Sequence, residues 1–202
     1  MIARLSRLDE SQRLRLGWTS LLLGIPAIVV GILIAHFALL PPEVDRGFFE
    51  FIPRGWPWFT AGQIIAFGGS QLMLFGAAMI WVANQPLTWA RASFGAFIAW
   101  VEFVLLFGVV PSEWLNLSQG PLGWTSQNIA FTIPPWLVLG NEVQISFGAI
   151  KDAISGGYYL LVFVGWIVVA YLLQDWGKTP PGGEEPKVRT SPYGRPLIRV
   201  ED

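Results

Sequence analysis

An ionisable side chain inside an apolar stretch is the feature of this sequence best suited to chemistry. Glu102 interrupts the otherwise uncharged run Ala92–Val110, next to its middle residue. A charged group at the centre of a bilayer is costly, and such residues usually face protein or water. Ser70 and Gln71 lie at a similar depth in the preceding run, Phe59–Ala83. We therefore expect an intramembrane polar cluster formed by Glu102, Ser70 and Gln71.

The cluster admits two interpretations. In the structural one, which we favour, a protonated Glu102 hydrogen-bonds to Ser70, Gln71 or a partner subunit and holds helices together. In the functional one, the same carboxyl carries protons as part of a small transporter or channel. Small side chains let helix backbones approach closely in lipid, so the two small-residue faces are expected to meet. These faces consist of Ala92, Gly95 and Ala99 on one side and Gly62, Ala66, Gly69 and Gly76 on the other.

The single histidine, His36, lies near the end of the apolar stretch Trp18–Leu40. At 1.5 Å per residue it lies roughly 10 Å from the depth of Glu102, so a metal ion held by both is not expected. His36 could contact a haem or chlorin as one axial ligand, with the remaining contacts in a neighbouring subunit. A lone histidine at this depth is more often a hydrogen-bonding residue of the membrane interface, which is the interpretation we favour.

The composition excludes most other chemistry. The chain has no cysteine and one histidine, which removes disulfides, thiolate zinc sites, iron–sulfur clusters and histidine-rich metal centres. It contains no Gly-rich phosphate loop, no G-x-S-x-G elbow and no H-E-x-x-H motif. The 13 basic and 14 acidic residues give no case for nucleic-acid binding. We expect no catalytic residue, no metal site and no cofactor of its own, although lipid or quinone could be held at a subunit interface.

Long apolar segments must position these residues. Hydrophobic residues make up 53% of the chain and charged residues 13%, against about 25% charged in typical soluble proteins. A spanning helix needs about 20 mostly apolar residues, and four stretches qualify. The sequence predicts an all-α integral membrane protein whose membrane domain, 18–173, contains transmembrane helices at about 18–40, 59–83, 92–110 and 153–173.

The basic residues predict the orientation of these helices. With the N-terminus in the cytoplasm, ten of the 13 lysines and arginines lie on the inner side, as the positive-inside rule expects. Tryptophans flank the predicted spans at both ends, where amphipathic rings are enriched. Both termini are therefore expected to be cytoplasmic, in a multi-pass protein of the plasma membrane.

Three segments lie outside the predicted spans. The N-terminal segment, 1–17, places Ile2, Leu5 and Leu8 on one face, which suggests a helix on the leaflet surface or a flexible charged start. The tail at 174–202 is rich in proline and charge, a composition that cannot bury enough apolar surface to order itself.

The third segment, 111–152, is expected outside the cytoplasm, and its residues 136–150 fit two structures. Gly140-Asn141 between short apolar runs fits a tight hairpin. Alternatively, Val143, Phe147, Ile150 and Ile154 share one face of a helix that would run into the last span. We favour the helix. The carboxylates of this and the other outer loop, Glu113 among them, are expected to be solvated.

Parts of the C-terminal half resemble a known group of proteins. The stretches concerned are Val110-Pro111-Ser112-Glu113-Trp114-Leu115-Asn116-Leu117, Gly123-Trp124-Thr125-Ser126-Gln127, Lys151-Asp152-Ala153-Ile154 and Tyr193-Gly194-Arg195-Pro196. Together they resemble small uncharacterised membrane proteins that accompany bacterial respiratory complexes of the cytochrome bc type. The resemblance includes no catalytic motif, so it carries no functional residue over. It implies a bacterial inner membrane and a respiratory electron-transfer partner.

Three functions remain as hypotheses. The leading one is a non-catalytic accessory subunit of a multi-subunit energy-transducing complex, surrounded by lipid and by other membrane subunits. The second is a small proton-linked transporter or channel that uses Glu102. The third is a pigment- or haem-contacting membrane subunit that uses His36.

Overall fold

The computed structural model describes residues 9–83, 85 and 88–174. The helix expected at the very start of the chain and the proline-rich tail beyond Gln174 lie outside this part. The chain divides into two compact units, Met1–Val164 and Gly165–Asp202. Of the second unit, the structure describes only the last turns of one helix, which ends at Gln174. The contacts that follow all lie within the first unit.

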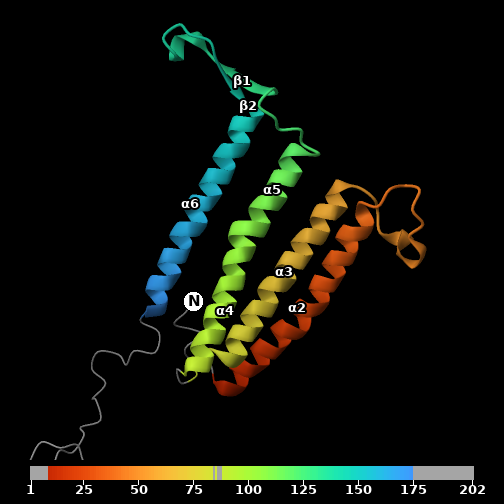
Figure 1. The fold of residues 1–202 in the computed structure, drawn as a ribbon, viewed down its shortest axis with the longest axis vertical. Coiled ribbons are helices and arrows are strands. Elements are labelled where there is room, and N and C mark those ends of the chain that lie inside the picture. The colour runs from red at the N-terminus through yellow and green to blue at the C-terminus, as the bar shows by residue number, and fades with distance from the viewer. Residues whose placement is uncertain (1–8, 84, 86–87, 175–202) are drawn as a thin grey trace, which may run out of the picture. The chain divides into compact units, whose positions relative to one another are not determined.

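The structure is mostly helical, with four helices long and apolar enough to cross a membrane (Figure 1). The third is continuous through three elements, because α4 passes through a π turn, η2, into α5. The loop between the first two helices and the segment before the last helix lie at the same end (Figure 1). The helices are α2 (Glu10–Ala38), α3 (Trp56–Trp81), α4 (Trp89–Val104) with η2 (Leu105–Val109) and α5 (Val110–Gln119), and α6 (Phe147–Gln174).

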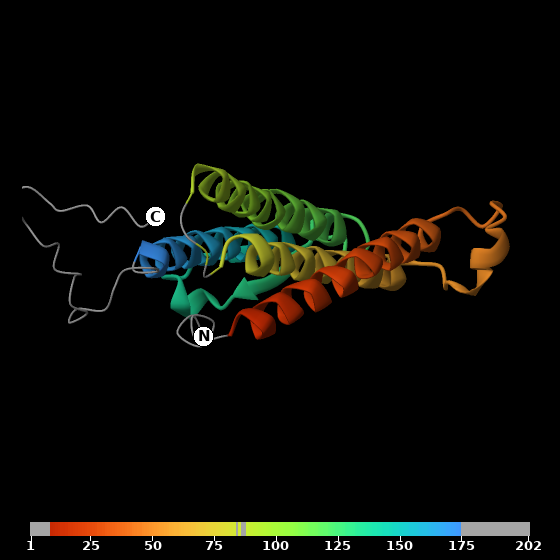
Figure 2. The ribbon, with the colours of Figure 1, turned by 90° about the horizontal axis from the view of Figure 1, so that it is seen from below.

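α2 and α3 lie next to each other in both views (Figure 1 and Figure 2). Glycines spaced seven residues apart join the two helices. A Cβ at Gly24 would lie 2.7 Å from the Gly69 carbonyl oxygen, and a Cβ at Gly69 would lie 2.8 Å from that of Gly24. The same reciprocal contact joins two further pairs, one toward each end. Apart from the 3.2 Å between a Cβ at Gly17 and the Gly76 carbonyl oxygen, these carbonyl distances are closer than a real Cβ can approach, so glycine is needed for this separation of the backbones. The other two pairs are Gly17 with Gly76 and Gly31 with Gly62.

This pairing corrects the expected partner of the glycine face on α3. Gly62, Gly69 and Gly76 face α2 and not the helix that carries Glu102. On α4, a Cβ at Gly95 would meet only the Val82 side chain, at 3.5 Å, so no comparable backbone approach exists there. The glycines of α3 were expected to pack against Ala92, Gly95 and Ala99 of α4. They pack against α2 instead, because its glycines have the same seven-residue spacing and allow a closer backbone approach than alanines do.

A buried arginine closes one end of the α2–α3 pair. The Arg13 side chain is 2% exposed, and its guanidinium donates to the carbonyl oxygens of Met79 at 2.5 Å and Ile80 at 3.2 Å. Carbonyls in the last turn of a helix have no intrahelical donor and carry the negative end of the helix dipole. Arg13 therefore caps the C-terminus of α3 from the neighbouring helix.

The third helix extends past the proline at which it was expected to stop. Five residues, Leu105–Val109, form a π turn, in which the Val110 N–H donates to the Leu105 carbonyl oxygen. Proline clashes with the carbonyl four residues before it in a regular α-helix. The wider turn directly before Pro111 relieves that clash, and the helix continues to Gln119. Glu113 consequently lies on a helix and not in an outer loop.

Residues 129–146 form a hairpin, so the favoured helix for this segment is wrong, and the fold is not entirely α. Strand β1 (Ile129–Ile133) pairs antiparallel with β2 (Val143–Ser146), and α6 begins only at Phe147. The hairpin is also wider than the tight one considered, because the strands do not start beside Gly140. Pro134 and Pro135 lack the N–H that a ladder requires, so β1 ends before them.

The loop between α2 and α3 is held by arginines. Arg46 donates to the carbonyl oxygens of Ile52, of Phe37 at 3.3 Å and of Glu50 at 3.1 Å. Arg54 donates to those of Pro41, of Leu40 at 2.9 Å and of Val44 at 3.2 Å. These basic residues satisfy backbone carbonyls of an irregular segment that has few backbone partners of its own.

We expect Gly69→Ala to destabilise the α2–α3 pair by about 1–3 kcal/mol, because the new methyl group must push the backbones apart. Gly68 is the matched control, since a Cβ there meets nothing within 4 Å. Gly68→Ala should be neutral or stabilising by up to about 1 kcal/mol through its helix propensity. Thermal unfolding of both variants in nanodiscs measures the difference, and equal midpoints would contradict the glycine pairing.

Candidate functional site: the groove between α3 and α5

The structure brings Glu102 and Gln71 together. The Gln71 amide donates to the Glu102 carboxyl oxygen over 3.0 Å, between the middle of α3 and the end of α4. Ser70 takes a different partner, since its hydroxyl donates to the Phe67 carbonyl oxygen of its own helix at 2.7 Å. Two of the three residues in the expected cluster are thus directly bonded, and Ser70 lies beside them without joining the bond.

A second pair of the same chemistry lies farther along the same helices. The Gln63 amide donates to the carboxyl group of Glu113, which the Asn116 amide also approaches at 3.5 Å. Two glutamines of α3 therefore each bind a glutamate of the α4–α5 helix. Sequence reasoning missed this pair, because it ended the helix before Pro111 and left Glu113 in solvent. The eight-residue spacing of Gln63 and Gln71, about two turns on one face, was the available signal.

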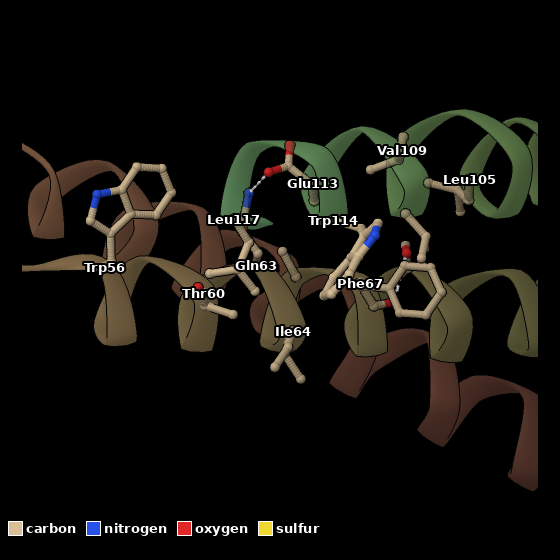
Figure 3. Close-up of a pocket in the computed structure, with 13 residues that line it drawn as sticks. Trp56, Thr60, Gln63, Ile64, Phe67, Leu105, Val109, Glu113, Trp114 and Leu117 are labelled. Carbon is tan, nitrogen blue, oxygen red and sulfur yellow. Dashed lines mark hydrogen bonds between the residues drawn. The ribbon is translucent and has the colours of Figure 1, made fainter. Parts of the chain in front are cut away.

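A groove of about 590 Å³ lies between α3 and the η2–α5 region, a volume within the usual range for ligand sites. Figure 3 shows the Gln63–Glu113 bond crossing it, with the Trp56 indole at one end and Phe67 farther along. Its walls are mostly apolar, and Glu113 is the only charged residue among those that line it. The lining residues are Trp56, Thr60, Gln63, Ile64, Ala66, Phe67, Ser70, Leu105, Val109, Val110, Glu113, Trp114 and Leu117.

One polar atom in the wall of the groove lacks a partner. The Trp114 indole nitrogen is buried, and no group in the described part of the chain accepts its hydrogen bond. The ring itself is fixed by an edge-on contact with Trp124, with centroids 5.7 Å apart. Buried N–H groups are usually hydrogen-bonded. Trp114 therefore offers a donor in the groove wall that no described residue of the chain accepts.

The π turn shapes the groove and frees a carbonyl behind it. Leu105 and Val109, the first and last residues of η2, both line the groove. The Leu106 carbonyl would be the next acceptor in the π pattern, but its donor would be Pro111, which has no N–H. The Tyr158 hydroxyl of α6 donates to that carbonyl at 2.8 Å instead. This bond, and the stacking of Tyr159 on Phe107 with centroids 6.2 Å apart, attach α6 behind the groove.

His36 lies apart from the groove. It is exposed in the last turn of α2, where its ring meets Phe37 edge-on at 5.1 Å between centroids. In the described part of the chain, no three His, Cys, Asp or Glu side chains come together as metal ligands would.

Comparison of the chain with protein-family models, with curated proteins and with solved structures finds no match. The site is consequently interpreted from its own geometry.

We expect Tyr158→Phe to weaken the attachment of α6 by about 0.5–1.5 kcal/mol, because the Leu106 carbonyl loses its donor. Tyr159→Phe is the matched control, since it removes a hydroxyl but keeps the ring that stacks on Phe107. Hydrogen exchange of the residues 105–110 and thermal unfolding in nanodiscs compare the two. Equal behaviour of the variants would contradict the proposed role of Tyr158.

Proposed function

We propose that this chain is a non-catalytic accessory subunit of a multi-subunit energy-transducing membrane complex, and that α4 provides its contact with a partner subunit. The observation that carries the proposal is the exposure of the Trp100 side chain. This side chain is 62% exposed near the middle of a membrane-length helix, two residues from the Glu102–Gln71 bond. Tryptophan normally lies at the membrane interface, where its N–H can reach water or a head group.

The surroundings of Trp100 support a protein partner. No hydrogen bond joins its indole N–H to another described residue, and hydrocarbon offers no acceptor for that group. The ring stacks on Phe97, with centroids 6.2 Å apart, and Phe97 is itself 56% exposed. A neighbouring helix with a polar side chain would satisfy the N–H and cover both rings.

The distribution of packing agrees with this interpretation. The close contacts of the fold join α2 to α3, whereas α4 has no buried residue. In the third and fourth membrane-length helices, no residue of the most apolar stretch is buried. A lone transporter would need a packed path between its helices, whereas an accessory subunit completes its packing on a partner.

The proposal also includes an orientation of the chain in the membrane and the kind of complex to which it belongs. The arginines near the start of α2 and the basic residues of the tail favour a cytoplasmic location for both termini. The resemblance that the four stretches of the C-terminal half carry together, to small membrane proteins of bacterial respiratory complexes, supports a respiratory electron-transfer complex as the partner assembly. On this proposal the chain contributes no catalytic residue, and a lipid or quinone would lie at its border with the partner.

We expect Trp100→Leu to lower the recovery of partner subunits about tenfold or more when the chain is purified from native membranes in mild detergent, since interface tryptophans are frequent hot spots. Trp89→Leu is the matched control, because Trp89 begins the same helix, where an interfacial ring needs no protein partner. Mass spectrometry of the co-purifying proteins and an absorbance spectrum give the readout. Migration of the wild-type chain alone would refute the accessory role.

The rival function is proton transport through Glu102. It is favoured by the carboxyl groups of Glu102 and Glu113, which both lie between the α4–α5 helix and α3. Glu102→Gln separates the two functions, because glutamine keeps a hydrogen bond to Gln71 but carries no proton. Under the accessory proposal, Glu102→Gln leaves stability and assembly near the wild type, and Glu102→Leu costs about 1 kcal/mol. Under the rival, Glu102→Gln abolishes proton flux into proteoliposomes, which a pH-sensitive dye inside the vesicles measures.

A further inference from the structure

We propose that the groove between α3 and η2–α5 binds one uncharged amphiphile. Its oxygen-bearing head lies against Glu113 and Trp114, and its apolar chain lies along Phe67 and the π turn. The ligand class is a hydroxyl- or carbonyl-headed molecule with one long apolar chain, either a neutral glycerolipid or an isoprenoid quinone or quinol. The site belongs to this chain alone, so the proposal stands independently of the accessory role.

The dimensions of the groove fit such a ligand. Its lining on α3 runs from Trp56, the first residue of the helix, to Ser70. The fourteen steps between these two residues, at 1.5 Å each, give a length of roughly 20 Å along the helix axis. The groove therefore extends from the helix end toward the middle of the span, parallel to the direction in which a membrane amphiphile stands. Gln63, which bonds Glu113, lies halfway along this length, so about 10 Å of an extended chain can lie between the head and Ser70.

The polar groups of the groove complement one kind of head. The carboxyl of Glu113 accepts from Gln63 and Asn116, but its two oxygens have about four lone-pair sites, so it can accept from a ligand hydroxyl as well. The Trp114 indole N–H is an unused donor, suited to a ligand carbonyl or hydroxyl oxygen. A single oxygen-bearing head can satisfy both groups after a small movement of the indole.

The charge of the groove selects against anions. Glu113 is the only charged residue in the lining, and no lysine, arginine or histidine accompanies it. A phosphate or carboxylate head placed against Glu113 would bring two like charges together in a medium of low dielectric constant. Ordinary anionic phospholipid heads are thereby disfavoured at this position, and uncharged heads are favoured.

The apolar part of the groove fits the hydrocarbon chain of the ligand. Phe67 of α3 lines this part of the groove together with Leu105 and Val109 of η2, whereas the Ile64 side chain is 67% exposed and points away from η2 (Figure 3). The π turn matters here, because it widens the helix locally and displaces these side chains from the positions that a regular α-helix would give them. π turns within α-helices occur frequently at functional sites.

Photolabelling tests the proposal on the purified full chain in nanodiscs of fixed lipid composition. Three probes are compared, a diazirine monoacylglycerol, an azidoquinone and a diazirine fatty acid. We expect one or both uncharged probes to label peptides containing Phe67 and Leu105, and the fatty acid to label them about tenfold less, as the loss of one charge-assisted contact implies. The uncharged probe that labels these peptides more strongly shows whether the ligand is a lipid or a quinone.

Matched variants separate a site from an ordinary lipid-facing surface. Val109→Trp fills the groove and should remove most of the labelling, whereas Val104→Trp adds the same ring to an equally exposed position outside the lining. Leu105→Trp adds a ring to the lining at the first residue of the π turn and replaces Val109→Trp if that variant does not fold. Glu113→Gln should abolish the discrimination against the fatty acid. Equal labelling of Val109→Trp and Val104→Trp, or equal labelling of the exposed Leu22–Leu23 face of α2, would overturn the proposal.

Discussion

The close approach of the α2 and α3 backbones is the constraint on which the rest of the structure depends. Three glycine pairs, with Gly24 and Gly69 at the centre, fix the separation and register of the two helices. Because those glycines occupy one face of α3, the face that carries Gln63 and Gln71 is left for another helix. This division of α3 has three consequences. The two Gln–Glu bonds form on the free face of α3, the groove lies between α3 and the η2–α5 region, and Phe97 and Trp100 of α4 stay exposed.

Backbone carbonyls without partners explain much of the remaining side-chain chemistry. Within a membrane such groups must be satisfied by the protein, since hydrocarbon supplies no donor. Arg13 satisfies the last carbonyls of α3, and Tyr158 satisfies the carbonyl that the π turn and Pro111 leave free. In the loop between α2 and α3, Arg46 and Arg54 do the same. The side chains of Arg13, Arg46, Arg54 and Tyr158 thus stabilise the fold through these bonds.

Two features of the structure remain unsatisfied by the chain itself, and each leads to a different kind of partner. The Trp114 N–H is buried at the wall of a groove, which suits a small amphiphile. The Trp100 ring is exposed in the middle of a membrane-length helix, which suits another protein. The two lie on the same continuous helix, on opposite sides of the π turn, so that ligand and partner can be tested separately.

The sequence alone determined the four membrane-length helices, because about 20 consecutive apolar residues have few alternatives to a spanning helix. It also indicated Glu102 with Gln71, since a carboxyl at that depth requires a partner. Tertiary structure decided which faces meet, because the glycines of α3 fit both neighbours by composition and only α2 carries the matching spacing. It also decided where helices end. A π turn lets the chain pass Pro111, and pairing with β1 takes Val143–Ser146 out of α6. The Gln63–Glu113 bond and the groove depend on that continuation, so no local pattern could have revealed them.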